Sequence, residues 1–113
     1  MKTLYAACLH RLGLSQAEAA ALHGNGLDTI KKRCSGKLGV PPGIWEELRA
    51  YEAGIVDRSE AIREAWEDAG EVREIEARWD DDAGLMALAD FILTTRVDPP
   101  LAVNTASPGP NRP

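Results

Sequence analysis

Three short amphipathic segments, each followed by a glycine, fill the first third of the chain and restrict its fold more than any other feature. Apolar residues recur at helical spacing over residues 3–12. Ser15, with Glu18 three residues later, forms a capping-box pattern ahead of a second segment that ends before Gly24. A third helix is expected over residues 27–34. Because runs of β-branched residues are short and nothing alternates for long, we expect an all-α fold.

The second half of the chain continues the helical pattern. Pro41-Pro42 favour the start of a helix that we expect to end near Gly54. Asp57 is a suitable cap for another helix, whose apolar side continues to Trp79, with a break or kink expected at Gly70.

The end of the chain contains one more predicted helix and then a change in composition. The helix is expected from Leu85 to about Thr95, capped by one of the aspartates at 80–82. Residues 98–113 hold five of the seven prolines and are expected to form a disordered tail. The sequence thus divides into residues 1–54, an acidic helical region at 55–97, and the tail.

Charge is unevenly distributed between the two halves. The net charge is -5 for all 113 residues, but residues 1–50 sum to +3 and residues 51–97 to -8. A basic first half joined to an acidic second half suggests two separate tasks. Only a local basic face, and not the whole surface, is expected to suit nucleic acid.

Several classes of protein are not favoured by the sequence. No apolar stretch suits a membrane span or a signal peptide, and two cysteines are too few for a disulfide scaffold, so we expect reduced thiols and a cytoplasmic location. Cys8 and His10 are about 200° apart around a helix, and with His23 and Cys34 they match no zinc pattern. No nucleophile arrangement or phosphate-binding glycine loop is visible, so we expect neither an enzyme nor a cofactor.

The two helices expected between residues 14 and 36 have the lengths and the short turn of a helix-turn-helix, in which the second helix enters the major groove of DNA. Three positions fit this geometry. Ala20 is small where the helices would pack, and Gly24 stands in the turn, where a positive φ is often required. Ile30 is expected to point from the second helix into the shared core.

These residues resemble the Cro-type helix-turn-helix family, also called the XRE family. The matching positions, with every spacing kept, are Ser15-Gln16, Ala20, Gly24, Thr29-Ile30 and Gly36. The loop and Trp45 that follow are similar to small phage and prophage members. The resemblance covers about residues 1–54 and implies a lambda-repressor-like DNA-binding domain.

The chain departs from the family pattern at four positions. Asn25 stands where an apolar residue is usual, and Gly26 replaces the usual Ser or Thr cap of the second helix. Near the end of that helix, Arg33 and Cys34 replace an apolar and an acidic residue.

The resemblance also implies which residues meet DNA. Base-reading positions correspond to Leu27, Asp28 and Lys32, whose side chains can contact a thymine methyl group, cytosine N4 and guanine O6/N7 respectively. Contacts with the DNA backbone are expected from a second set of residues: Gln16, Lys31, Arg33, Lys37 and Arg11.

Residues 85–93 are apolar on nearly every side of the expected helix, so they need burial on more than one side. We expect a homodimer through residues 57–95, with two recognition helices roughly 34 Å apart on a palindromic site; the alternative is a monomer in which the two halves form one bundle. The function expected is that of a double-stranded-DNA-binding transcriptional regulator, such as a dimeric repressor. The alternative is a protein-interaction module or antitoxin-like protein whose acidic half binds a partner.

Overall fold

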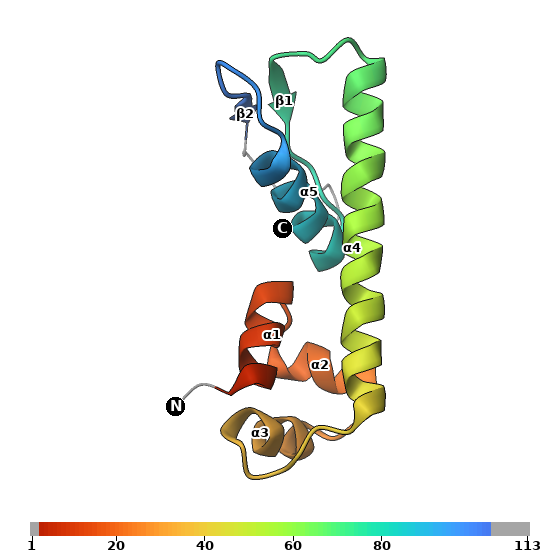
Figure 1. Ribbon diagram of the computed structural model, residues 1–113, viewed down its shortest axis with the longest axis vertical. Helices are drawn as coiled ribbons and strands as arrows, with labels where there is room; N and C mark the ends of the chain where they lie inside the picture. Colours follow the sequence, from red (N-terminus) through yellow and green to blue (C-terminus); the bar gives the residue numbers. More distant parts are fainter. Residues whose placement is uncertain (1–2, 105–113) are drawn as a thin grey trace. The chain divides into compact units, whose positions relative to one another are not determined.

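The computed structural model describes residues 3–104 and contains five helices and two short strands in that range (Figure 1). The chain forms two compact units, which divide between Glu52 and Ala53. This division falls inside the longest helix, α4 (Pro42–Asp68). The protein is predominantly helical, as the sequence predicts.

The N-terminal unit consists of α1 (Leu4–Leu12), α2 (Gln16–His23), α3 (Leu27–Ser35) and the first part of α4. Both α1 and α2 pack against α3. The core consists of side chains from all four helices and the α1–α2 turn: Tyr5, Leu9, Leu12, Leu14, Ala19, Ile30, Ile44 and Leu48.

Local signals fix the ends of these short helices. The Thr3 hydroxyl accepts a hydrogen bond from the backbone N–H of Ala6 at the start of α1. At the start of α2 the predicted capping box is confirmed: Ser15 Oγ accepts from Glu18 N at 3.0 Å, and Glu18 Oε1 accepts from Ser15 N at 2.9 Å. Gly26 caps α3 without a side-chain hydrogen bond.

Helix α4 differs from the sequence-based expectation. The sequence predicts a helix end near Gly54 and a new start at Asp57, but α4 runs through both residues without interruption. An isolated glycine inside a helix costs only about 1 kcal/mol relative to alanine. The buried apolar positions Leu48, Ile55 and Trp66 continue one helical stripe across it. The apolar spacing therefore outweighs the local preference of Gly54.

The C-terminal unit contains the rest of α4, β1 (Glu74–Glu76), α5 (Asp82–Thr94) and β2 (Ala102–Asn104). Trp66 of α4 packs edge-on against Phe91 of α5, with ring centroids 5.9 Å apart. Asp81 caps α5 by accepting a hydrogen bond from Gly84 N at 2.7 Å, which confirms a cap within residues 80–82. The Trp66–Phe91 contact and the hydrogen bond from Arg63 to Thr94 hold α5 against α4.

Two expectations for this unit are wrong. The break expected at Gly70 is confirmed, because α4 ends at Asp68 and Gly70 takes a left-handed φ of 89°, but the helical pattern expected to continue beyond it to Trp79 is wrong. Beyond this turn, β1 pairs in parallel with β2, with Ile75 opposite Val103. The expected disordered tail is also wrong for residues 102–104, because they form β2; residues 105–113 lie outside the described range.

Candidate nucleic-acid interface

The turn between α2 and α3 is short and depends on glycine. Gly24 has φ 66°, and its N–H donates to carbonyl groups of the last turn of α2. No atom lies within 4 Å of a Cβ built at Gly24, so the left-handed backbone, and not crowding, favours glycine here. Asn25 N then donates to Ala20 O at 3.0 Å, which closes the turn.

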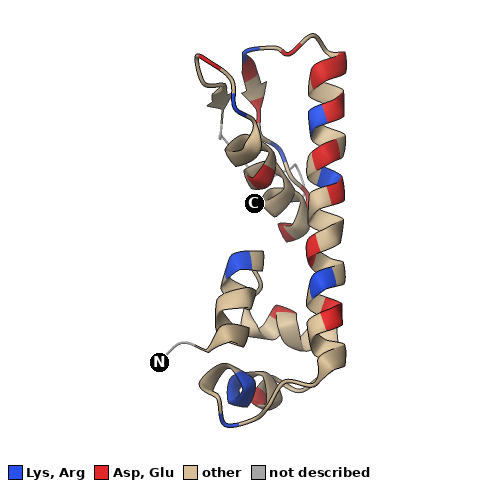
Figure 2. Cartoon of the chain, viewed as in Figure 1, with Lys and Arg blue, Asp and Glu red and all other residues tan. Residues whose placement is uncertain are grey.

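Helix α3 presents two distinct faces. Ile30 is fully buried and packs into the core of the unit, and Arg33 on the same side is 7 % exposed. The other face is exposed along the whole helix, and its residues are Leu27, Asp28, Lys31, Lys32 and Ser35. Figure 2 marks the Lys and Arg residues of α3 together with its single acidic residue. All three predicted base-reading residues thus share one exposed face.

Asp28 and Lys32 interact with each other on this face. Lys32 Nζ lies 3.1 Å from Asp28 Oδ2, one helical turn away, and both side chains are more than half exposed. An ion pair this exposed contributes only up to about 1 kcal/mol. It holds both side chains outside the core and can open at little cost when another partner is present.

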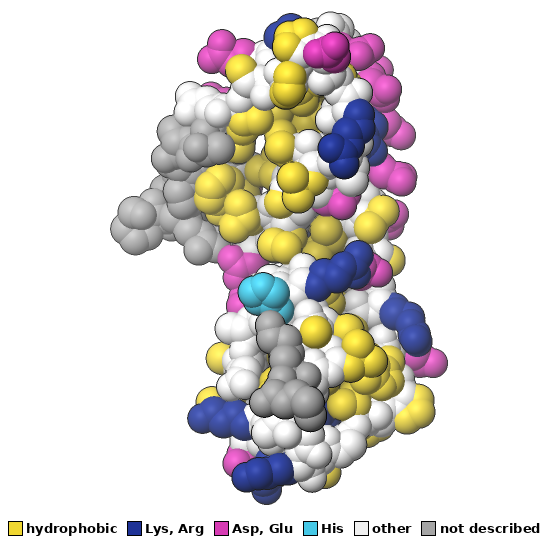
Figure 3. All heavy atoms as spheres, turned by 60° about the vertical axis from the view of Figure 1, so that its left-hand side comes forward, with side chains coloured by type: hydrophobic (Ala, Val, Ile, Leu, Met, Phe, Trp, Pro, Cys, Tyr) yellow, Lys and Arg dark blue, Asp and Glu magenta, His cyan; other side chains and the backbone are white. Residues whose placement is uncertain are grey.

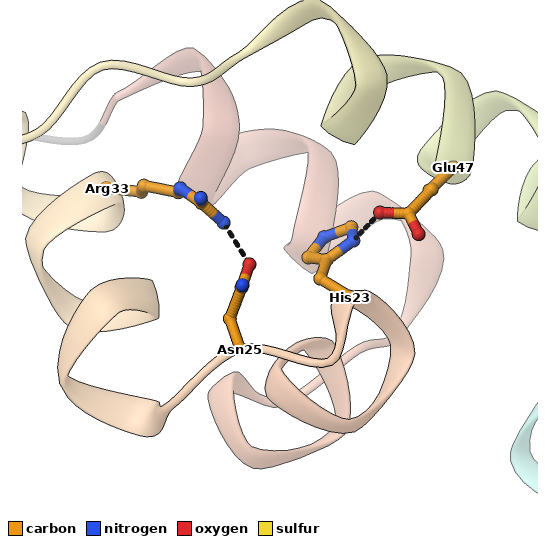
Figure 4. Close-up of polar contacts among 4 residues, drawn as sticks. All are labelled: His23, Asn25, Arg33 and Glu47. Atoms are coloured by element: carbon orange, nitrogen blue, oxygen red, sulfur yellow. Dashed lines mark hydrogen bonds and ion pairs between the residues drawn. The ribbon is translucent and has the colours of Figure 1, made fainter.

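Arg33 is not on the exposed face, so its predicted role as a phosphate contact is wrong. Its Nη1 donates a 2.7 Å hydrogen bond to Asn25 Oδ1 in the α2–α3 turn (Figure 4). Its Nε meets no hydrogen-bond acceptor within residues 3–104. A buried guanidinium that is tied to the turn cannot also reach a phosphate outside the core.

The Asn25–Arg33 hydrogen bond explains two of the four departures from the family pattern. Asn25 replaces an apolar residue in the turn, and Arg33 replaces another near the end of α3. Each change alone would leave a polar side chain without this partner, whereas here Asn25 Oδ1 accepts a hydrogen bond from Arg33 Nη1. Sequence reasoning treated the two positions separately and missed the pair.

The other predicted backbone contacts lie at the surface of the N-terminal unit. Gln16, Lys31 and Lys37 are exposed. Arg11 is also exposed but forms an ion pair with Glu52 of α4. Lys31 and Lys37 therefore lie where a phosphate can reach them. Arg11 must first release the carboxylate of Glu52 before it can bind a phosphate.

The small residue that α2 buries completely is not the one expected. Ala19 is fully buried in the core, whereas Ala20 is only half-buried. The Ala20 carbonyl nevertheless accepts the hydrogen bond that closes the turn, so the position is structural through its backbone.

A second polar contact, which sequence reasoning did not find, joins α2 to α4. His23 Nδ1 lies 2.9 Å from Glu47 Oε1, and the His23 side chain is completely buried (Figure 4). The imidazole also lies beside Tyr5, with ring centroids 6.1 Å apart. His23 is the last residue of α2, so this contact fixes the end of α2 just before the turn. Its only sequence signal is a histidine directly before the turn glycine.

Tyr5 lies at the centre of this polar part of the core. Its ring also meets Trp45 edge-on at 6.1 Å. Burial raises the pKa of the Tyr5 hydroxyl above its usual value, with a further increase from Cys34, while Arg33 acts in the opposite direction. Tyr5 therefore remains protonated and neutral at any pH at which the exposed face of α3 could meet nucleic acid.

Other kinds of site find little support within residues 3–104. No three His, Cys, Asp or Glu side chains of this range lie close enough together to share a metal ion. None of the helices in this range has the length and apolar character of a membrane span.

Comparison with known proteins adds no further assignment. The chain matches no protein-family model, no curated protein and no solved structure.

Proposed function

We propose that this protein is a sequence-specific DNA-binding transcriptional regulator that reads double-stranded DNA through the exposed face of α3. A single observation carries the proposal: Leu27, Asp28 and Lys32 share one exposed face of the second helix, while Ile30 and Arg33 anchor the opposite face. This division is what a helix in a major groove requires, because one side must meet base edges while the other is held by the protein.

The side chains on this face have suitable chemistry for reading bases. Lys32 can donate to guanine O6 and N7, Asp28 can accept from cytosine N4, and Leu27 can contact a thymine methyl group. The Asp28–Lys32 ion pair holds the two groups side by side, so it favours adjacent base pairs as their targets. Lys31 and Lys37 would hold phosphates and position the helix without specifying sequence. Binding of this kind regulates transcription either by occluding a promoter or by recruitment at it.

The proposal is tested by in vitro selection from random duplex DNA, followed by binding measurements on the selected site. We expect Lys32→Ala to reduce discrimination against a mutated base pair by about 1–3 kcal/mol, or about 5- to 150-fold. Lys31→Ala should weaken binding to all sequences and reduce the slope of log K against log salt concentration by about 1.

A matched control removes one positive charge outside α3. Arg73 is an exposed residue of the C-terminal unit, and Arg73→Ala makes the same change in net charge as Lys32→Ala. It should leave sequence discrimination unchanged. If selection enriches no sequence even at low salt, α3 does not read DNA. The same conclusion follows if Arg73→Ala loses as much sequence discrimination as Lys32→Ala.

A further inference from the structure

A groove lies between α1 and the first turns of α4, within the N-terminal unit. It has a volume of about 460 Å³ and is lined by side chains of these two helices: Leu4, Cys8, Arg11, Leu12, Trp45, Leu48, Arg49 and Glu52. It is called the α1–α4 groove below. Figure 3 shows hydrophobic side chains gathered on the face of this unit in view, with Lys or Arg side chains beside them. The volume is typical of sites that bind small molecules.

The α1–α4 groove has an apolar end and a charged end. At the start of α1, Tyr5 contacts Trp45 of α4, with ring centroids 6.1 Å apart. At the end of α1, Arg11 pairs with Glu52 of α4. The two helices therefore run in the same direction along the groove, and seven residues of each span about 10 Å. Leu4 and Trp45 line the apolar end, and Arg11 and Glu52 line the charged end.

The apolar part of the groove is only partly covered by the protein. Leu12 and Leu48 are buried. Cys8 and Trp45 are half-buried, and Leu4 is 72 % exposed. An apolar ligand that lies against these side chains removes their surface from water, which is favourable.

The charged end of the groove has one positive charge in excess. Arg11 and Glu52 pair with each other, so their charges balance. Arg49 lies three residues before Glu52, and its exposed side chain forms no ion pair within residues 3–104. One carboxylate on a ligand would neutralise Arg49, whereas the carboxylate of Glu52 opposes a second negative charge.

We propose that the α1–α4 groove binds a small molecule that has a flexible apolar chain and a single carboxylate, for which octanoate is a suitable probe. The carboxylate accepts hydrogen bonds from the Arg49 guanidinium, and the chain lies along Cys8 and Trp45 toward Leu4. Burial of the chain supplies most of the affinity, and the charged hydrogen bonds fix the direction in which the ligand lies.

A ligand in this groove is suited to regulate DNA binding, and this step alone rests on the proposed function. Helix α1 packs against α3, and Thr3 Oγ1, which precedes α1, donates a 2.8 Å hydrogen bond to Cys34 O of α3. The ligand also adds a negative charge to the unit that is proposed to meet phosphates. We therefore expect the bound ligand to weaken DNA binding, by about threefold at low salt.

The first test locates the ligand on the full chain without DNA. The chain has three tryptophans, and only Trp45 belongs to the N-terminal unit. We expect octanoate to shift the NMR signal of the Trp45 indole N–H in a saturable way, with the signal assigned by its loss in Trp45→Phe. Trp79 lines a separate apolar groove of the C-terminal unit and serves as the internal control. If the Trp45 signal shows no saturable shift, the proposal is wrong, whatever happens at Trp79.

The second test varies the ligand. Hexanoate should bind about tenfold more weakly than octanoate, because it lacks two methylene groups that the groove would bury. Inorganic phosphate has the negative charge without the chain, and octylamine has the chain with the opposite charge. Neither should match octanoate at the Trp45 signal. Equal binding of phosphate would indicate a simple anion site, and equal binding of octylamine would mean that Arg49 plays no part; either result would overturn the proposal.

The third test varies the protein. Arg49→Ala should weaken octanoate binding about tenfold, whereas Arg49→Lys, which retains the charge, should weaken it less. Arg73→Ala makes the same change in net charge in the C-terminal unit and should have no effect. Leu4→Asp places a carboxylate at the apolar end and should also weaken binding, while the exposure of Leu4 leaves the fold intact, as circular dichroism would check. Wild-type affinity in Arg49→Ala would refute the role of Arg49.

The last test separates this proposal from the proposed function. On a duplex obtained by selection, saturating octanoate should raise the Kd for DNA about threefold, and it should have little effect on DNA binding by Arg49→Ala. If selection enriches no duplex, the proposed function fails, but binding at Trp45 is still decided by the NMR titration. If octanoate shifts the Trp45 signal and leaves the Kd for DNA unchanged, the regulatory step is wrong and the binding site stands.

Discussion

The hydrogen bond between Asn25 and Arg33 makes a quantitative prediction about the stability of the N-terminal unit. Arg33 is 7 % exposed, so its charge cannot turn to water when its partner is removed. A hydrogen bond to a charged group contributes about 1.5–3 kcal/mol, and a buried charge without a partner loses that amount. We therefore expect Asn25→Leu to lower the free energy of unfolding by about 2–3 kcal/mol.

Removing the other partner should cost less. Asn25 is only half-buried, so its amide can bind water once Arg33 is gone. We expect Arg33→Met, which also removes a buried charge, to cost about 1 kcal/mol. The double variant Asn25→Leu/Arg33→Met replaces both polar groups with apolar ones. It should be more stable than the sum of the single changes predicts, by about 1.5 kcal/mol or more.

Urea unfolding followed by circular dichroism measures these differences, with an unchanged m-value as the condition for comparing variants. Ser35→Ala is a suitable control on the exposed face of α3 and should change stability by less than about 0.5 kcal/mol. If the single changes add to the double change within about 0.5 kcal/mol, the two side chains are not coupled, and the account of the turn is wrong.

Three further changes test the N-terminal unit. Ser15→Ala removes half of the capping box and should lower stability by about 1 kcal/mol in urea unfolding, whereas an unchanged midpoint would mean that the box contributes nothing. Gly24→Ala should cost about 1–2 kcal/mol through its positive φ alone, because a Cβ there meets no neighbour; a much larger loss would indicate crowding. Because burial raises the pKa of folded Tyr5 above its unfolded value of about 10, the folded state retains the proton longer, and stability should fall as the pH rises above that value. Melting temperatures measured at increasing pH should fall less steeply for Tyr5→Phe than for the wild-type protein. An identical pH dependence of the two proteins would contradict burial as the cause of the raised Tyr5 pKa.

The three short helices could be predicted from the sequence because their signals are local. The capping residue Ser15, the turn glycine Gly24 and the apolar spacing around Ile30 all act within one or two helical turns. The exposure of Leu27, Asp28 and Lys32 also follows from that spacing. Their contact with bases remains a prediction.

The features that sequence reasoning missed depend on distant partners. Nothing near Glu74–Glu76 signals a strand; these residues pair with Ala102–Asn104, almost thirty positions later. The charge of Arg33 suggests a surface cation, whereas its burial depends on Asn25 across the turn. The continuity of α4 past Gly54 depends on how the helix packs, which the low helix propensity of one glycine does not predict.

Because both compact units include part of α4, the chain has one helix where two-unit proteins often have a flexible linker. Starting a helix is unfavourable, since several residues must be fixed before the first hydrogen bond forms, whereas lengthening an existing helix is much easier. Whichever unit folds first therefore supplies the nucleus from which α4 grows into the other. Folding of the two units is thus expected to be cooperative through the backbone of α4.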